Sequence, residues 1–395
     1  MKNFAIAACV LLLLQAIGWS QNDFTTNWNN GYKVESADKD IKMKFGGRIQ
    51  FDMAYLTQDD SIKAAFGDKT NGVEFRRVRF FNEGRFYHNL HYKLQLEFSG
   101  GAVVFKDVFI EFSHLPVVGN LRMGHFKEPF RLEVLSSSKY MSFMEREAYV
   151  AFMSERNFGA MIHSEALGNR IGWQLGVFRN ADATGNDKNA GEDFNLTTRI
   201  SGLLLNDTDN DRVAQVGIGF SSRSPKGGEY KVASKPASHL APKYVSTGTI
   251  SNVSTVNLVN AEAVVITGPL YVQGEYLAAT VNAPNSSFFY SWYGQVSYIL
   301  TGEHRSLKNS YSGLKRLKPK HDAGSGGAGA WELALRYSEI NLNDGEVAGG
   351  EMNEWTFGVN WYLNPATRIM ANYVRADVAN LGKSNIFETR VMIDF

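Results

Sequence analysis

The alternation of apolar and polar residues constrains this chain more than any other feature. Between Ile41 and Tyr55 one parity is mostly apolar, whereas the other carries charged and amide side chains such as Arg48 and Asp52. Successive side chains of a β-strand point to opposite faces, so this pattern predicts a strand with one apolar and one polar face. The same pattern returns at Tyr92–Phe98 and in the last residues, Phe387–Phe395.

Sixteen segments with this character follow one another and are separated by turn-like stretches. They cover residues 41–56, 73–87, 90–99, 102–114, 120–127, 158–166, 170–180, 194–205, 213–223, 256–267, 270–281, 287–300, 329–340, 351–362, 367–376 and 386–395. A soluble antiparallel sheet with one wet face accounts for any single hairpin. The whole set of long, aromatic-rich strands instead favours an all-β fold, a transmembrane antiparallel up-and-down β-barrel of about 16 strands.

The start of the chain has the pattern of a secretion signal. Lys2 is followed by an apolar run from Phe4 to Ile17, and small residues then place a cleavage site after Ser20. A retained membrane anchor is the alternative. We therefore predict a signal peptide at 1–20, a polar periplasmic lead-in without a fold of its own at 21–40, and a barrel domain at 41–395. Cleavage removes Cys9, the sole cysteine, and with it any disulfide or cysteine-based metal site.

The charge balance and the motifs argue against several classes of function. The formal net charge is +1, which speaks against a general nucleic-acid binder. The sequence contains no Gly-rich phosphate loop, H-E-x-x-H or G-x-S-x-G motif. His88 and His91 flank a tight turn and could contact a metal, although such a pair is more often plain polar surface. We expect no cofactor and no enzymatic activity.

Residues 128–157 form a connection that is too long for a turn and too apolar for a solvated loop. Apolar side chains on that scale require burial, so we expect the connection to fold into the barrel and narrow the pore. The alternative is an outer loop packed on a neighbouring subunit. Its basic residues are Arg131, Lys139, Arg146 and Arg156, with Lys127 at its edge, and they oppose Glu128, Glu133, Glu145, Glu147 and Glu155. Opposed charged walls of this kind make a polar constriction.

Basic side chains also follow the predicted lumen and one further connection. If the parity is right, the strand residues that point inward are Arg48, Arg77, Arg79, Arg85 and Lys93. Guanidinium forks suit phosphate and carboxylate oxygens, although Glu83 and Glu97 could neutralise some of them. Residues 302–328 are strongly basic and, like 57–72, 181–193 and 224–255, are long enough for outer loops. We interpret residues 302–328 as a basic mouth of the pore that concentrates anions, with a solvated loop or a loop that faces lipopolysaccharide as the alternative.

Several motifs resemble the phosphate-selective porin O and P family. They are Leu121-Arg-Met-Gly-His-Phe-Lys-Glu-Pro-Phe130, Ser142-Phe-Met-Glu-Arg146, Arg156-Asn-Phe-Gly159, Leu300-Thr-Gly-Glu303, Ala330-Trp-Glu-Leu-Ala-Leu-Arg-Tyr337 and Gly358-Val-Asn-Trp-Tyr-Leu-Asn364. The terminal Arg390-Val-Met-Ile-Asp-Phe395 looks like the assembly signal of such barrels. Together these matches run from about residue 40 to the end of the chain.

The resemblance implies a trimeric, 16-stranded porin of a Gram-negative outer membrane that takes up anions such as phosphate or polyphosphate. It implies that Lys127, Glu145 and Arg146 are motif positions, and by location it associates Arg77 and Arg79 with the anion path. Arg131 and Glu147 depart from the residues common at their positions and add charge of both signs to the loop.

We therefore predict a passive pore for small hydrophilic solutes with a preference for anions. Its expected partners are small anions, outer-membrane lipids and lipopolysaccharide, two further copies of the chain, and the outer-membrane assembly machinery through Phe395. The alternatives are a barrel that only displays adhesive or binding loops, and a barrel enzyme.

Overall fold

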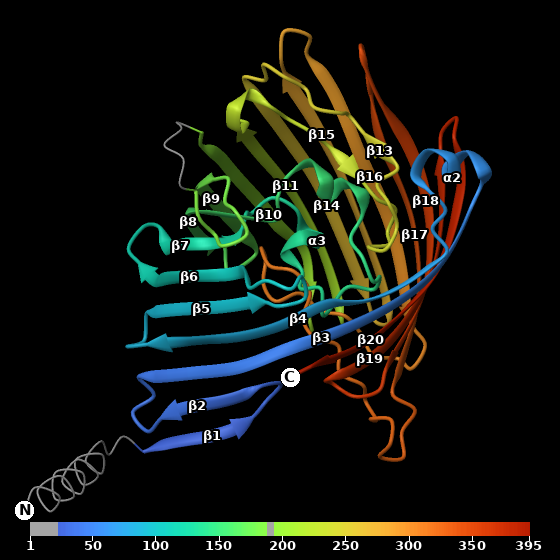
Figure 1. Ribbon diagram of the computed structural model, residues 1–395. Helices are drawn as coiled ribbons and strands as arrows, with labels where there is room; N and C mark the ends of the chain where they lie inside the picture. The colour runs from blue at the N-terminus through green and yellow to red at the C-terminus, as the bar shows by residue number, and fades with distance from the viewer. Residues whose placement is uncertain (1–22, 188–192) are drawn as a thin grey trace, which may run out of the picture.

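A closed antiparallel barrel dominates the computed structural model, which describes residues 23–187 and 193–395. Its strands are β3 (Ile41–Gln58), β4 (Asn71–Phe86), β5 (Leu90–Glu97), β6 (Val104–Leu115), β7 (Gly119–Lys127), β8 (Arg156–Ala166), β9 (Ile171–Arg179), β10 (Asn195–Asp207), β11 (Arg212–Arg223), β14 (Thr255–Thr267), β15 (Leu270–Asn282), β16 (Ser287–Ile299), β17 (Ala330–Asp344), β18 (Val347–Tyr362), β19 (Thr367–Val378) and β20 (Gly382–Asp394). Each pairs with the next, and β20 closes on β3. The predicted sixteen strands are confirmed (Figure 1).

The two faces of the wall have opposite chemistry, as the alternation predicts. On β18, Trp355 and Phe357 point outward and are about half exposed, whereas Glu354 and Thr356 are buried on the inner face. Outward aromatic rings form two belts on β16–β18. Trp331 stacks on Trp361 near one end, and Trp292, Tyr337 and Trp355 cluster nearer the other. Such belts mark the interfaces of a membrane, and the barrel therefore spans one. Among the described residues, no helix is both long and apolar enough to cross a membrane.

The segment before the barrel is not the unstructured lead-in that we expected. Strands β1 (Phe24–Trp28) and β2 (Tyr32–Ser36) form a hairpin, and β2 pairs with the first residues of β3. β20 pairs with the rest of β3 from Arg48 onward, so β2 continues the sheet where β20 ends. This prediction is wrong because the 18-residue strand β3 extends past β20 and leaves an edge to be paired. The predicted signal peptide lies outside the described residues.

The two ends of the barrel differ in their connections. Short turns, such as 87–89, 167–170 and 268–269, join strands at the end that holds the C-terminus. Barrels of this class have short periplasmic turns, so we assign this end to the periplasm. The long connections 59–70, with helix α2 (Asp60–Phe66), and 224–254 lie at the outer end.

Residues 300–329 join β16 to β17 at the periplasmic end, not at the outer end where we predicted 302–328 (Figure 1). The prediction failed because length alone assigned the segment to the outside, whereas the order of the strands fixes its end. This stretch, hereafter the periplasmic segment, folds into the barrel. Ser310 Oγ donates to Glu165, and Gly313 lies against Ser136.

Two segments from the outer end also enter the barrel. One is the inner loop, residues 128–155, with α3 (Leu132–Leu135) and η2 (Ala148–Phe152). The other is the outer cap, residues 224–254, with η3 (Lys226–Gly228), β12 (Ala233–Ser234) and β13 (Val245–Ser246). Phe130 and Phe152 of the inner loop pack with Tyr244 and Val253 of the cap in one apolar cluster. The inward fold predicted for 128–157 is therefore confirmed.

The outer rim of the wall reverses the usual polarity of a barrel. Ile340, Leu342 and Met352 point inward and pack in the same apolar cluster as the outer cap. On the outward face at this height, Tyr290 donates a hydrogen bond of 2.7 Å to Glu339. Apolar residues that face inward at the rim thus bind the cap by hydrophobic burial, at about 1.5–3 kcal/mol for each large side chain.

Candidate functional site: a basic cavity inside the barrel

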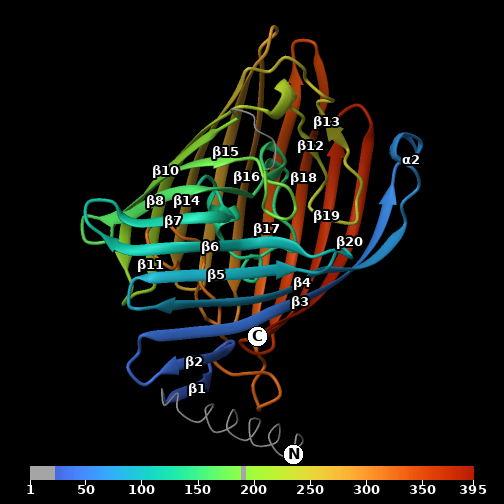
Figure 2. The ribbon, with the colours of Figure 1, turned by 60° about the vertical axis from the view of Figure 1, so that its left-hand side comes forward.

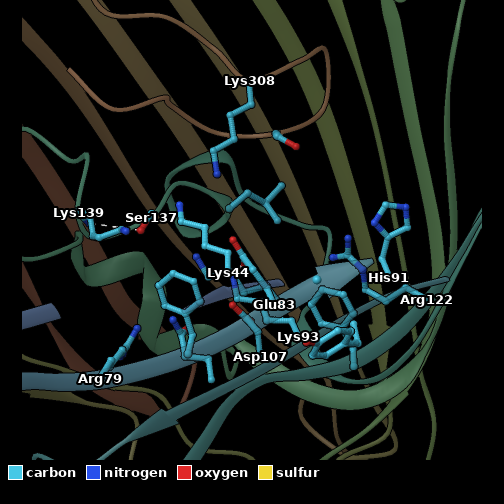
Figure 3. A pocket seen from close by; sticks show the side chains of 18 of the residues that line it. Lys44, Arg79, Glu83, His91, Lys93, Asp107, Arg122, Ser137, Lys139 and Lys308 are labelled. Carbon is cyan, nitrogen blue, oxygen red and sulfur yellow. Dashed lines mark hydrogen bonds and ion pairs between the residues drawn. The ribbon is translucent and has the colours of Figure 1, made fainter. Parts of the chain in front are cut away.

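The inserted segments leave one large cavity of about 730 Å³ against the wall formed by β3–β8. Residues of β3–β9, the N-terminal hairpin, the inner loop and the periplasmic segment line it. In Figure 2, β3–β7 lie side by side across this wall. Thirteen lysine and arginine side chains and only four acidic ones line the cavity. Figure 3 shows Lys308 pointing into it from the periplasmic segment, opposite Lys93 and Glu83 of the wall.

Carboxylates of the wall neutralise some of these cations. Arg79 is 2.5 Å from Glu97, and Lys93 is 2.7 Å from Glu83. Arg122 pairs with Glu111, and Arg156 pairs with Asp107. Glu97 and Glu83 therefore neutralise Arg79 and Lys93, as the sequence suggested.

Other cations of the cavity have no carboxylate within ion-pair distance among residues 23–187 and 193–395. They are Lys33, Lys44, Arg48, Arg85, Lys127 and Lys308. Arg48 donates to Ser138 Oγ at 2.6 Å, and Lys127 donates to the carbonyl oxygen of Ser136 at 3.1 Å. Three ammonium groups, those of Lys44, Lys93 and Lys139, surround the Phe81 ring at 5.2–5.9 Å from its centre. The six cations without a carboxylate partner therefore carry charge that no other described residue offsets.

A β-bulge in β4 brings two consecutive arginines to the inside. The register of β3 with β4 shifts between Gln50 and Phe51, so Arg76 is the extra residue. Arg76 and Arg77 both reach Glu145 of the inner loop, at 2.8 and 3.5 Å. Arg76 was not among the predicted lumen residues, because its parity differs from that of Arg77. The sequence does contain a signal for the bulge, because the charged residues change parity there, from Glu74 and Arg76 to Arg77 and Arg79.

Four of the five acidic residues of the inner loop pair with arginines of the wall and do not line the cavity: Glu128, Glu133, Glu145 and Glu147. The fifth, Glu155, lines the cavity and pairs with Arg146 and Arg156. Glu145 is 2.8 Å from Arg390, and Glu128 is 2.9 Å from Arg223. Burial by itself raises the pKa of Glu145, but the neighbouring arginines hold it well below its usual range. The expected constriction between opposed walls is therefore wrong for these side chains, because wall arginines pair with the loop carboxylates.

Seven of the ten predicted site residues line the cavity. They are Arg48, Arg79, Arg85, Lys93, Lys127, Arg146 and Arg156. Arg77 and Glu145 pair with each other behind it. Arg131 is 1% exposed and donates to the carbonyl oxygen of Met153, so it packs inside the protein and does not line the cavity.

The periplasmic segment and the inner loop each add a cation to the cavity that was not among the predicted site residues. Lys308 belongs to the stretch that we had assigned to an outer mouth, yet it lines the cavity. Lys139 lies 3.1 Å from Asp394, and burial lowers the pKa of Lys139 to about 7.

The histidine pair does not converge. His88 Nδ1 lies 3.0 Å from Asp40, and His91 contacts Ser113. Within residues 23–187 and 193–395, no group of three His, Cys, Asp or Glu side chains is placed to hold a metal ion.

Comparison with known proteins decides the family. The model of the family "Phosphate-selective porin O and P" matches residues 43–395. The chain belongs to the phosphate-selective porin O and P family. It is 25% identical to Porin O of Pseudomonas aeruginosa over 403 residues, which cover 92% of this chain and 89% of that protein. The 395-residue chain is therefore a porin and a multi-pass β-barrel of the outer membrane.

Solved structures show the same fold at low sequence identity. A loop L8 deletion mutant of OmpT, an outer membrane protein of Vibrio cholerae, aligns with a TM-score of 0.58 at 11% identity, covering 90% of this porin and 100% of that chain. An anion-selective porin from Comamonas acidovorans aligns with a TM-score of 0.55 at 13% identity, covering 90% and 100% of the two chains.

Proposed function

We propose that this porin lets small hydrophilic anions diffuse passively through the basic cavity. The observation that carries the proposal is the charge of the lining, thirteen basic against four acidic side chains. A lumen lined by one sign of charge with low-dielectric walls concentrates ions of the opposite sign. Lumen charges tune selectivity in barrels of this kind.

Phosphate is the solute that we place first. The family is named for phosphate selectivity, and this porin is similar in sequence to Porin O of Pseudomonas aeruginosa. Arg48 offers a guanidinium without a carboxylate partner, and a planar fork suits phosphate oxygens. The carboxylates of Glu133, Glu145 and Glu147 do not oppose this, since they pair with Arg336, Arg76 and Arg390 of the wall.

The assembly of the porin is part of the proposal. OmpT of Vibrio cholerae, a fold relative with a TM-score of 0.57, has been solved in a trimer form, which supports a trimer here. The outward apolar face suits outer-membrane lipids and lipopolysaccharide. Phe395 pairs with Gly47 through its backbone, next to the seam where β20 meets β3, a position suited to recognition by the assembly machinery.

Single-channel recording tests the function. In planar bilayers with chloride we expect discrete open channels, and phosphate added at low concentration should reduce the chloride conductance. Open channels without block by phosphate would leave a general pore and contradict phosphate binding. A closed barrel would contradict the pore itself and favour a barrel that only displays loops. Turnover of lipid or peptide substrates would instead indicate an enzyme.

A further inference from the structure

Arg375 of β19 points away from the barrel interior, toward the membrane. Its side chain is exposed, whereas its two neighbours along the strand are buried on the inner face. In the register of the sheet it lies between Trp355 of β18 and Asn385 of β20, and these three strands are adjacent in the wall (Figure 1). A transmembrane strand needs about 9–11 residues, and Arg375 is the ninth residue of β19 counted from Thr367 at the periplasmic end. The guanidinium therefore lies at the outer edge of the bilayer, at the level of the lipid headgroups.

Arg375 differs from two other outward-facing cations at this end of the barrel. Arg179 of β9 lies 2.8 Å from Asp187, and Lys383 of β20 lies 3.4 Å from Asp377. Within residues 23–187 and 193–395, no carboxylate lies within ion-pair distance of Arg375, and no acceptor is hydrogen-bonded to its guanidinium. A charge on the membrane-facing side of a barrel is unfavourable near the hydrocarbon unless it finds a partner. We therefore expect an anionic group of the membrane to pair with this cation.

An amide donor stands beside the Arg375 guanidinium. Asn385 is the direct cross-strand neighbour of Arg375, and such neighbours have Cα atoms about 4.5–5.5 Å apart. The hydroxyl of Tyr373 donates to Asn385 Oδ1 at 2.9 Å, which leaves the amide nitrogen of Asn385 without an acceptor among the described residues. A planar guanidinium and an amide group side by side present several N–H donors, and this arrangement suits the oxygens of a phosphate.

Aromatic rings form the outward surface next to this polar pair, on its periplasmic side. Phe357 of β18, Tyr373 of β19 and Phe387 of β20 lie opposite one another in one row of the sheet. They are between 39% and 53% exposed, so each offers a ring face or edge to the membrane. A ligand with acyl chains can pack on these rings while its headgroup reaches Arg375. The surface therefore fits an anionic lipid better than a free anion.

Carboxylates of the outer rim do not cancel the charge of Arg375. Asp377, two residues farther along β19, already pairs with Lys383, so these three side chains together keep a net positive charge. Glu339 and Glu351 belong to β17 and β18 and lie farther toward the exterior in the register of the sheet. A lipid headgroup at the height of Arg375 therefore meets a local excess of positive charge.

The end of the barrel at which Arg375 lies identifies the lipid. This end carries the long connections 59–70 and 224–254, which place it at the cell exterior. The outer leaflet of a Gram-negative outer membrane consists mainly of lipopolysaccharide, whose lipid A carries phosphate at the headgroup level. We propose that Arg375 and Asn385 bind a lipid A phosphate of lipopolysaccharide, with its acyl chains packed on the aromatic row beside them. This inference rests on the lipid contact proposed above for the outward face and does not depend on passage of anions through the cavity.

Lipid A binding by the detergent-solubilised full-length mature porin tests the site. The dissociation constant is measured by microscale thermophoresis for three probes: phosphorylated lipid A, lipid A stripped of its phosphates, and phosphatidylglycerol. Phosphorylated lipid A should bind the wild type about fivefold or more tightly than either of the other probes. Equal binding of the stripped lipid would contradict recognition of phosphate. Equal binding of phosphatidylglycerol would show that any anionic lipid fills the site and would contradict lipid A as its occupant.

Substitution of Arg375 locates the contact. Arg375→Gln should weaken the binding of phosphorylated lipid A about fivefold, because a basic residue near a membrane surface contributes about that factor, and Arg375→Lys should retain most of the affinity. Arg212→Gln is the matched control. Arg212 is exposed at the periplasmic start of β11 and also has no carboxylate within ion-pair distance among the described residues, so its change should leave the affinity unaltered. Equal affinity of the wild type and Arg375→Gln, or an equal loss in Arg212→Gln, overturns the site.

The outcomes for the site and for the pore can be told apart. A wild-type porin that does not bind lipid A at all overturns both the site and the lipid contact proposed above. Binding that Arg375→Gln leaves unchanged overturns the site alone. Channel conductance and its block by phosphate are recorded on the same variants, and Arg375→Gln should match the wild type there because its side chain lies outside the barrel. Heat-modifiable migration on a gel confirms that each variant is folded.

Discussion

The two walls of the barrel interior use the same kinds of residue for different purposes. Along β10–β20, arginines and glutamates are fully buried and pair with the inner loop, as Arg336 does with Glu147 and Arg390 does with Glu145. Along β3–β8, several partly exposed cations line the cavity without a carboxylate partner, among them Lys44 and Arg85. Charge that is paired and dry holds the loop in place, whereas charge that is unpaired and wet acts on solutes.

The largest expected effect comes from the paired wall, which is the wall formed by β10–β20, where buried arginines pair with carboxylates. Glu145→Gln leaves Arg76, Arg77 and Arg390 without their shared carboxylate. Breaking a buried pair in this way should lower the free energy of unfolding by about 3–5 kcal/mol, measured by urea titration in lipid vesicles. Glu83→Gln, which removes the partly exposed partner of Lys93, is the matched control and should cost less than about 1 kcal/mol. Equal losses would erase the distinction between the walls.

Reversal of unpaired cations should change selectivity instead. Lys44→Glu combined with Lys308→Glu alters two charges that face the cavity from opposite sides. One charge a few ångströms from an ion is worth about 1 kcal/mol in water, so the anion-to-cation permeability ratio should fall about tenfold or more. Lys320→Glu changes an exposed lysine of the periplasmic segment that does not line the cavity, and it should leave the ratio nearly unchanged. A similar effect from both variants would indicate a general field and no specific role for the cavity.

The prediction of the fold from sequence succeeded where the signal is local. Period-two alternation located all sixteen barrel strands, since each strand carries its own pattern. Two features depend instead on how the strands are ordered and paired: the end at which residues 300–329 lie, and the hairpin formed by β1 and β2. The length and polarity of a segment do not predict strand order or pairing. The bulge at Arg76 was missed for a different reason: the change of polar parity between Arg76 and Arg77 marks it in the sequence, but the strand was assigned the parity of Arg77 alone.

The prediction of the site was limited by contacts between distant residues. Basic residues of the lumen were found from parity, but whether each one is free depends on its partner. Glu145 and Arg390 lie 245 positions apart. Counting charges within 128–157 therefore suggested a balanced constriction, whereas all the loop carboxylates except Glu155 are bound by arginines of the wall.

Removal of the inner loop should open the barrel. Deletion of residues 132–150 takes away the main filling of the paired wall, and a 16-stranded barrel without it encloses a wide aqueous channel. Single-channel conductance should rise by roughly twofold or more. The folded state of the variant is checked by its heat-modifiable migration on a gel. A folded variant with unchanged conductance would show that the loop does not narrow the path.

The smallest expected effect concerns pH. The ammonium group of Lys139, which faces Asp394, Arg48 and Arg316, has a pKa lowered to about 7 by burial, so it loses its charge as the pH rises through neutrality. The anion-to-cation permeability ratio should therefore fall, by less than about twofold, between about pH 6 and about pH 8. Lys139→Met should remove this dependence, and Lys93→Met should retain it. A ratio that rises with pH in the wild type would contradict the assignment.

The sign of the zero-current potential in a salt gradient tests the central claim most directly. The porin is inserted into a planar bilayer with a roughly tenfold difference in potassium chloride concentration across it. A lumen whose unpaired charge is positive predicts a potential of negative sign on the dilute side, because chloride crosses faster than potassium. A positive potential on the dilute side would show cation preference and would contradict the account.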